Sequence, residues 1–292
     1  MTPRRESTRR EPPRLLLSAR SLDGLTRATH DRRLEAAMRY RESESLAVTL
    51  SKALDAGAEG VLATPSPALR AALTELKRTV PIAAVLPALN EHDRLEMDPD
   101  LEALIRRRER LAGAGARVWT SLATLGRLPL LWRSDWSTQL PVLIELEAAA
   151  LRRRELWAVV LSADLTDRAL AAGNRGMFEV FCRFVRRRFR AHAALETRNL
   201  GVLLARLAEW SMTPDFIVGP VNPRGLVMKP SAAEVLEQLR RSSVPVVATE
   251  LRAGGNVTLA EGARYAREHG ARGVAPDLVD LDDVAELKAL VG

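Results

Sequence analysis

Several residue types are scarce in this chain of 292 residues, and each scarcity removes a class of function. Cys182 is the only cysteine, so the chain can form neither an internal disulfide nor a cluster of thiolate metal ligands. We expect this cysteine to be a small buried hydrophobic residue. Zinc ligands normally recur at short spacings, whereas the histidines of this chain are scattered at His30, His92, His192 and His269.

Long apolar runs are also missing. No run approaches the roughly 18 residues that a membrane span requires. The segment before Pro12 carries arginines but no apolar core of a secretory signal. We therefore expect a cytoplasmic protein. The first apolar run is followed by Ser18 to Gly24, which lacks the G-x-G-x-x-G pattern, so the sequence shows no nicotinamide or flavin signature and leaves the cofactor unknown.

Lysine is rare as well, because only four of the 44 basic residues are lysines. The arginines that give the net charge of +7 are spread through nearly every predicted helix. No arginine run is interleaved with aromatic residues, and no zinc-finger or RNP spacing appears. This distribution indicates an arginine-rich composition and does not favour nucleic acid as a partner.

Short apolar runs rich in Val, Leu, Ile and Ala recur along the chain, and most of them end in polar residues, Gly or Pro. Such runs are typical of strands that are buried on both faces of a sheet. The predicted strands are Leu15 to Ala19, Gly60 to Thr64, Ile82 to Pro87, Trp157 to Ala163, Ala193 to Arg198, Phe216 to Asn222, Pro245 to Glu250 and Gly273 to Asp277.

Predicted helices alternate with these strands, as at Arg32 to Arg41, Ser45 to Ala56 and Ser231 to Arg241. Eight alternating units predict an α/β fold, the (β/α)8 TIM barrel, with an open doubly wound sheet as the competing architecture. We read residues 1–14 as a flexible basic arm and 15–292 as the barrel, with an extended excursion over 88–156 after the third strand.

Within the excursion, residues 118–136 carry Trp119, Trp132 and Trp136 among leucines and arginines. Burial inside the protein explains this segment adequately. The alternatives are a contact in a homo-oligomer or lid and, with less support, a membrane surface.

Candidate site residues follow from the architecture, because barrel enzymes build their active sites from the C-terminal ends of the strands and the loops after them. The predicted catalytic acids are Asp164, Glu196 and Glu250. The predicted substrate-binding residues are Arg20, Arg198, Asn199, Asn222, Arg224, Arg252, Gly254 and Gly255.

Side chains alternate along a strand, so Glu196 and Arg198 share a face, as do Glu250 and Arg252 if that strand persists. Arginines at the mouth would bind a carboxylate or phosphate through two parallel hydrogen bonds. The alternative is that each acid and arginine neutralise each other in the barrel interior. Gly254 and Gly255 could cradle a phosphate, or could simply initiate the following helix at Thr258.

The acids also bear on metals, since Mg²⁺ prefers oxygen ligands. Asp164, Glu196, Glu250 and Asp277 could hold this ion, although the pattern supports no specific metal site. Lys229 is the one lysine near a strand end, and it lies about seven residues beyond the strand. It is therefore expected in a loop and not at the position of a Schiff-base lysine.

Residues Phe216 to Leu278 resemble the closing units of aldolase-type and aldo-keto-reductase-type barrels. The resemblance rests on Gly219-Pro-Val-Asn-Pro-Arg-Gly, Pro245-Val-Val-Ala, Ala253-Gly-Gly and Gly273-Val-Ala, covers about a fifth of the chain and is generic. It implies a barrel without a specific family. The reductase tetrad does not carry over, because the only tyrosines, Tyr40 and Tyr265, fall on predicted helices.

The leading functional hypothesis is an enzyme that acts on a small anionic metabolite at the barrel mouth, with lyase or isomerase chemistry. Glu196 or Glu250 would act as the general base. The alternative is a non-catalytic barrel that serves as a binding or assembly module through residues 118–136.

Overall fold

All eight predicted strands are present in the computed structural model, which describes residues 11–20, 29–76, 78–87, 136–148, 151, 156–278, 285–288 and 290. Each strand overlaps its predicted range. The strands are β1 Leu16–Ser18, β2 Gly60–Ala63, β3 Ile82–Leu86, β4 Leu156–Leu161, β5 His192–Glu196, β6 Phe216–Pro220, β7 Val246–Thr249 and β8 Gly273–Val274.

The strands form one parallel sheet in the order β1 to β8. The two ends of this sheet meet through parallel bridges that pair Leu15 with Val274 and Ser18 with Asp277. The Ser18 N–H also donates to the Pro276 carbonyl at 2.8 Å. Sequential parallel order together with contact between the first and last strands defines a closed (β/α)8 barrel and excludes the open doubly wound sheet.

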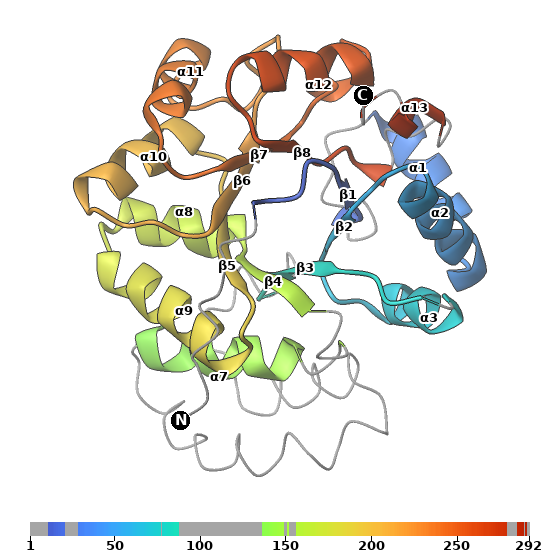
Figure 1. The fold of residues 1–292 in the computed structure, drawn as a ribbon, viewed down its shortest axis with the longest axis horizontal. Coiled ribbons are helices and arrows are strands. Elements are labelled where there is room, and N and C mark those ends of the chain that lie inside the picture. The colour runs from blue at the N-terminus through green and yellow to red at the C-terminus, as the bar shows by residue number, and fades with distance from the viewer. Residues whose placement is uncertain are drawn as a thin grey trace, which may run out of the picture.

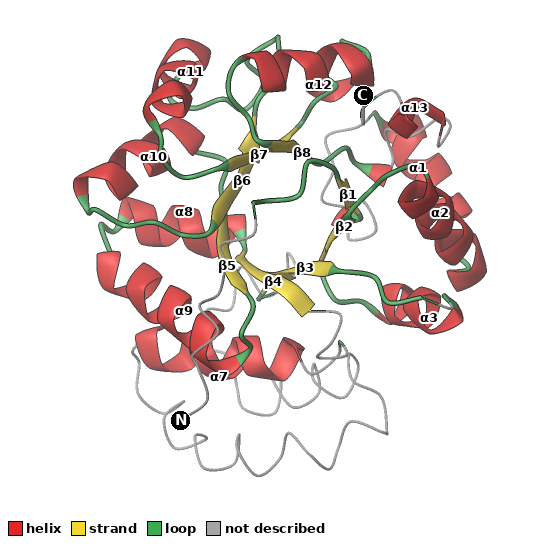
Figure 2. Cartoon of the chain, in the orientation of Figure 1, coloured by secondary structure: helices red, strands yellow, loops and turns green. Residues whose placement is uncertain are grey.

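Helices surround the ring of strands (Figures 1 and 2). All but the last of them occupy the connections between consecutive strands, because parallel strands need a crossover connection. The helices are α1 His30–Arg39, α2 Ser43–Asp55, α3 Pro67–Glu75, α7 Trp136–Ala148, α8 Ala163–Ala171, α9 Arg175–Arg188, α10 Leu200–Glu209, α11 Ala232–Arg241, the 3-10 turn η4 Ala253–Gly255, α12 Leu259–Glu268 and α13 Ala285–Lys288.

Polar N-caps fix where several of these helices begin. Ser231 accepts a hydrogen bond from the Glu234 amide at 3.2 Å, so α11 begins at the predicted serine cap. Thr258 likewise accepts from the Glu261 amide at 3.2 Å at the start of α12. The helix predicted from Ser45 begins earlier, since the N-cap of α2 is Glu42.

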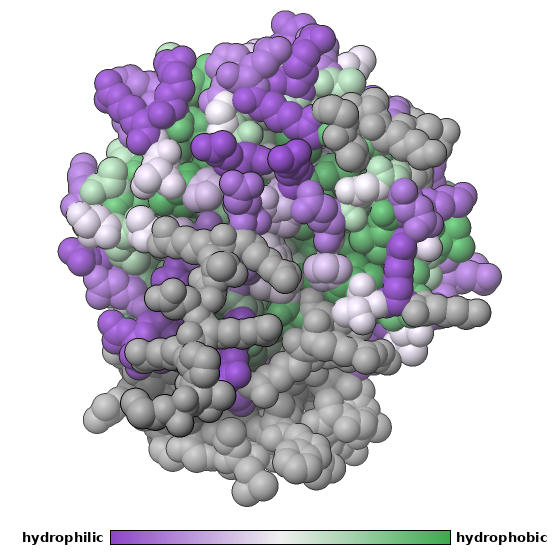
Figure 3. All heavy atoms as spheres, viewed as in Figure 1, coloured by the Kyte–Doolittle hydropathy of each residue, from purple (hydrophilic) through white to green (hydrophobic). Residues whose placement is uncertain are grey.

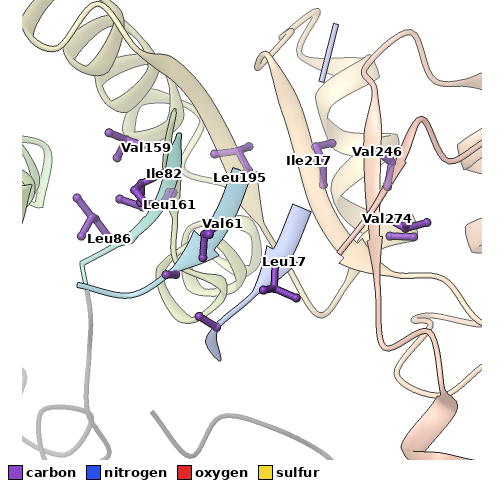
Figure 4. Close-up of a cluster of buried hydrophobic side chains, with 14 of the residues drawn as sticks. Leu17, Val61, Ile82, Leu86, Val159, Leu161, Leu195, Ile217, Val246 and Val274 are labelled. Atoms are coloured by element: carbon purple, nitrogen blue, oxygen red, sulfur yellow. The ribbon is translucent and has the colours of Figure 1, made fainter. Parts of the chain in front are cut away.

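The core consists of two shells, because side chains on a strand alternate between its faces. The inner shell fills the barrel and includes Leu16, Leu62, Val85, Val160, Phe216, Val218 and Val247 together with small alanines. The outer shell packs between the strands and the helices; Figure 4 shows members of it, among them Leu17, Val61, Ile82, Leu161, Leu195 and Ile217. Two apolar faces explain why the strand sequences read as continuous apolar runs.

A β-bulge lies at the N-terminal end of the barrel interior. Ile82 pairs with Leu156 and Ala83 with Ala158, which leaves Trp157 as an extra residue on β4. The Trp157 ring stacks on Phe216 with centroids 5.4 Å apart and lies 4.8 Å from the His192 ring. These aromatic residues stand at the starts of β4, β5 and β6 and cover the inner shell at that end of the barrel.

Several predicted features lie wholly or partly outside the described residues. The excursion over 88–156 contains α7, but residues 88–135 are not described, so the contact role of residues 118–136 stays a prediction. The same holds for residues 1–10 of the predicted arm. Arg14, at the end of that arm, already belongs to the barrel, because its carbonyl accepts from Val274 at 3.0 Å.

The outer surface carries most of the charge. In the view of Figure 3, hydrophilic side chains cover the outward faces of α11 and α12. Nowhere in the described ranges does a helix combine the length and apolarity needed to cross a membrane.

Gly273 makes the closure of the ring sterically feasible. A Cβ atom on this residue would lie 2.1 Å from the Pro13 carbonyl oxygen. We expect Gly273→Ala to lower the free energy of unfolding by about 2 kcal/mol, because the first and last strands would have to separate. Urea denaturation measures this loss.

Gly176→Ala is the matched control. Gly176 lies within α9, and the nearest atom to its added Cβ would be 3.7 Å away. Because alanine favours a helix over glycine, this variant should be neutral or more stable by up to about 1 kcal/mol. Equal stability changes in the two variants would contradict the role assigned to Gly273.

Cys182 is a buried core residue of α9, as its sequence context predicts. Burial raises the pKa of its thiol from 9.0 to about 11. The unfolded chain therefore loses this proton at lower pH than the folded chain, so the contribution to stability is present below pH 9.0 and is lost as the pH rises to about 11.

We expect the free energy of unfolding of the wild type to fall by about 2 kcal/mol more than that of Cys182→Ala between pH 8 and pH 11. Urea denaturation at each pH supplies the comparison. Parallel pH profiles for the two proteins would show that the thiol does not titrate differently on unfolding.

Candidate active site

Polar side chains form a layer at the C-terminal ends of the strands. Inner-shell residues such as Leu16, Leu62, Val160 and Ala194 face the barrel axis, and residues two positions later face the same way. These later residues are Ser18, Thr64, Ser162, Glu196, Thr249 and Asp277. We call this set the polar layer; its members at β1, β2, β4 and β5 are buried.

Glu196 is the buried acid of this layer, with 7% of its surface exposed. Its Oε1 forms an ion pair with Arg20 Nη1, and the exposed fractions of the two side chains are only 9% and 13%. Its Oε2 accepts a hydrogen bond from the Ala163 amide at 3.2 Å. Ala163 is the first residue of α8, so the positive end of that helix also faces the carboxylate.

Ser162 stands beside this ion pair. It follows β4, whose last residue Leu161 pairs with Leu195, the neighbour of Glu196 on β5. The Ser162 side chain is 6% exposed, and its Oγ makes no hydrogen bond within the described residues. Buried hydroxyls are normally hydrogen-bonded, and leaving one unsatisfied costs about 1–3 kcal/mol. This hydroxyl is therefore available to a ligand.

Ser162 lies near the end of the fourth predicted strand, Trp157 to Ala163, and is not among the predicted site residues. The signal that identifies it is the alternation of β4, where Ala158 and Val160 belong to the inner shell. The same alternation places Glu196, a predicted catalytic acid, in the polar layer.

Asp164 and Arg198, both predicted site residues, pair with each other. Arg198 Nη1 lies 2.7 Å from Asp164 Oδ1, with the arginine 36% and the aspartate 18% exposed. Asp167, one turn further along α8, accepts from Thr197 Oγ1 and from the Arg198 amide. These contacts join α8 to the loop after β5, and the partner of Arg198 is therefore Asp164 and not Glu196, the acid two positions before it on the strand.

Asn222 organises the loop after β6. It is fully buried, its Nδ2 donates to the Leu226 carbonyl at 2.9 Å and its Oδ1 accepts from the Leu226 amide at 2.9 Å. Both functional atoms of the amide are therefore used within the loop. Arg224 lies in the same loop and is exposed.

Asn199 lies at the start of the connection to α10. Its backbone amide donates a hydrogen bond to Thr197 Oγ1 at 2.8 Å, and its side chain makes no capping hydrogen bond to α10. Lys229, the lysine near a strand end, is an exposed loop residue, as its spacing predicts.

The chain leaves β7 at Thr249, so the expectation that Glu250 and Arg252 share a strand face is wrong. Glu250 has a φ of 56°, in the left-handed region, and this turns the chain away from the strand direction. Arg252 Nη1 approaches Glu286 of α13 at 3.5 Å. The two residues are therefore placed by a tight loop and not by strand alternation.

The glycines of this loop serve the turn itself. Gly254 and Gly255 have φ values of 71° and 94°, which glycine adopts readily. The Gly255 backbone amide donates to the Arg252 carbonyl at 2.9 Å, and the Ala253 backbone amide donates to the Glu250 backbone carbonyl at 2.9 Å. The amides of Ala253 and Gly255 are therefore used within the loop, and the phosphate-binding role of Gly254 stays a prediction.

The predicted magnesium ligands do not gather. Across the described ranges, no group of three or more His, Cys, Asp or Glu side chains is arranged to hold a metal ion. The acids Asp164, Glu196, Glu250 and Asp277 all lie in those ranges. The binding of Mg²⁺ by these acids therefore stays a prediction from the sequence.

No protein-family model and no curated protein sequence matches the chain. The structure is similar to a crystal structure of an aldo/keto reductase from Brucella melitensis, with a TM-score of 0.45 and 12% identity over 86% of this chain and 84% of that one. It is also similar to the metallated form of the homocysteine methyltransferase MmuM from Escherichia coli, with a TM-score of 0.46 and 14% identity over 94% of each chain. Likeness at this level says nothing about the reaction, and the assignment of the barrel rests on strand order and closure.

The Arg20–Glu196 pair can be tested by a double-mutant cycle on unfolding. We expect Arg20→Met and Glu196→Gln each to cost about 3 kcal/mol, because each leaves a buried charge without its partner. The double variant should be more stable than the sum of the two losses by about 2 kcal/mol.

The exposed pair of Arg206 and Glu209 on α10 provides the control cycle. Its coupling should stay below about 0.5 kcal/mol, because water screens exposed charges. Urea denaturation gives both values. A coupling at Arg20 and Glu196 no larger than that of the control would show that the two buried charges do not depend on each other.

Proposed function

We propose that this barrel is an enzyme that acts on a small anionic metabolite, carboxylated or phosphorylated, by lyase or isomerase chemistry at the C-terminal mouth. The observation that carries the proposal is the buried Arg20–Glu196 pair beside the unsatisfied Ser162 hydroxyl. A base, a cation and a free hydroxyl within one polar layer are the groups that proton abstraction next to a carbonyl needs.

Glu196 is the proposed general base. A carboxylate has about four lone-pair sites, and Arg20 and the Ala163 amide each use one of them. A remaining site can accept the proton of a substrate C–H bond, while the electron pair of that bond moves onto the carbonyl to form an enolate. In a substrate with a hydroxyl on the deprotonated carbon, that hydroxyl gives its proton to the enolate oxygen and the former carbonyl carbon takes up the abstracted proton, which completes an isomerisation. In a substrate with a leaving group on the carbon β to the carbonyl, that group departs with its bonding electron pair as the carbonyl and a C=C bond form, which completes a lyase reaction.

Ser162 and Arg20 are the proposed stabilisers of the enolate oxygen. A hydroxyl donor and a guanidinium that are already held in place lose little reorganisation energy when negative charge develops. Removal of one such donor typically costs about 100-fold to 1000-fold in rate.

Arginines further out are proposed to hold the anionic group. Arg198 is partly exposed at the edge of the mouth, and a guanidinium carries five N–H donors, so its pairing with Asp164 leaves further donors available. Arg224 is exposed on the loop after β6. Glu250, Asn199 and Arg252 complete the proposed site from the neighbouring loops.

Hydrogen–deuterium exchange tests the proposed chemistry directly. The protein is incubated in D2O with dihydroxyacetone phosphate, pyruvate or 2-oxoglutarate, and loss of the carbon-bound proton is followed by NMR. We expect exchange with at least one compound in the wild type and a loss of at least about 100-fold in Glu196→Gln, because the amide cannot accept the proton.

Glu209→Gln is the matched control, since Glu209 is 58% exposed on the outer face of α10. It should exchange at the wild-type rate. Exchange that persists in Glu196→Gln would remove Glu196 as the base, and a wild type inactive with every compound of the panel would count against the reaction class.

A further inference from the structure

A concavity lies at the end of the barrel opposite the polar layer, where β1, β2 and β8 begin. Its volume is about 590 Å³, and the charged residues among its described lining are Arg14, Glu59, Arg267 and Arg272. Arg14, Glu59 and Arg272 stand just before the three strands, and Arg267 lies in the last turn of α12. This basal pocket, defined by these four residues, is remote from the polar layer.

Among the described residues that line the basal pocket, positive charge exceeds negative charge. Glu59 Oε1 accepts a hydrogen bond from the backbone amide of Arg14 at 3.0 Å. Arg267 Nη2 donates a hydrogen bond to the Leu290 carbonyl. Neither contact places a carboxylate against a guanidinium group. Arg14, Arg267 and Arg272 form no ion pair with another described residue. Other surface arginines of the described chain do, such as Arg186 with Asp215 and Arg241 with Glu237.

The electrostatics of Arg267 agree with this excess. Burial, and in second place the positive charge of Arg14, lower the pKa of the Arg267 guanidinium. Like charges that are held in one concavity raise its affinity for an anion, because binding relieves their mutual repulsion.

We propose that the basal pocket is a second anion site that binds the phosphate group of a small metabolite. Three guanidiniums and one carboxylate leave a charge of two, which a phosphate dianion neutralises, and arginine matches phosphate oxygens through paired N–H donors. The volume exceeds that of a phosphate ion and leaves room for a small organic portion. The proposal is independent of the chemistry at the mouth.

Binding in the basal pocket would connect the two ends of the sheet. Arg14 directly precedes Leu15, and Arg272 directly precedes Gly273, so a phosphate held by both arginines bridges the first and last strands. A ligand that binds only the folded state raises the melting temperature in proportion to the logarithm of its concentration above Kd.

Thermal unfolding and calorimetry at constant ionic strength test this site, with inorganic phosphate, ribose 5-phosphate and ribose as probes and sodium chloride as the balancing salt. We expect a saturable rise of several degrees with both phosphates and none with ribose. A ribose 5-phosphate Kd at least tenfold below that of inorganic phosphate identifies an organic phosphate as the ligand, and equal values identify the phosphate group alone.

The double variant Arg14→Gln and Arg272→Gln should lose the saturable rise. Arg240→Gln with Arg241→Gln, on the exposed end of α11, removes the same charge elsewhere and should retain it. Arg272→Lys keeps the charge but not the paired donors, so it should weaken binding several-fold; calorimetry well below the melting temperature keeps this comparison valid if a variant is less stable.

Two results would overturn the proposal. A saturable rise that survives in the Arg14 and Arg272 double variant would place the phosphate elsewhere, for example at the mouth. A rise that grows linearly with phosphate and is the same in all variants would be a general salt effect on protein hydration and not binding.

Discussion

The first strand meets the last through backbone hydrogen bonds that Ser18 and Val274 donate to Pro276 and Arg14. These short contacts turn a sheet of eight parallel strands into a ring, and glycine at 273 permits the close approach they require. Once the ring is closed, every strand has one face toward the axis and one toward the helices. The two-shell core and the polar layer follow from this geometry.

The composition of the polar layer shows how a barrel places charge in its interior. Six of the eight strands contribute apolar residues to the inner face and a polar residue only at or just after their ends, as in the step from Val160 to Ser162. The carboxylate of Glu196 is tolerated at this depth because Arg20 and the start of α8 both face it. The charge therefore depends on two neighbouring structural units as well as on its own strand.

The strands and their inward-facing residues could be predicted from the sequence, because burial on two faces leaves a direct pattern of apolar runs. Alternation placed Glu196 correctly, since β5 is regular through that residue. The loops could not be predicted in the same way. Glu250 adopts a left-handed conformation and Asn222 bonds to Leu226, and both outcomes depend on local backbone angles that hydropathy does not encode.

Ion pairs between different loops and helices also could not be predicted from the sequence. Arg198 and Asp164 are separated by 34 positions and meet because α8 begins next to the end of β5. Arg252 is directed toward α13 by a turn that follows β7. Such contacts are set by how units pack side by side, so a list of polar residues after strands contains the buried acid Glu196 but not the partner of each arginine.

The bulge at Trp157 affects which end of the barrel gives access to the interior. Its ring and that of Phe216 cover the start of the inner shell, and the shell above them is filled with side chains. Among the described residues, side chains therefore fill the interior from this end up to the polar layer. A substrate of the site proposed at Glu196 would enter, and its product would leave, through the same end of the barrel.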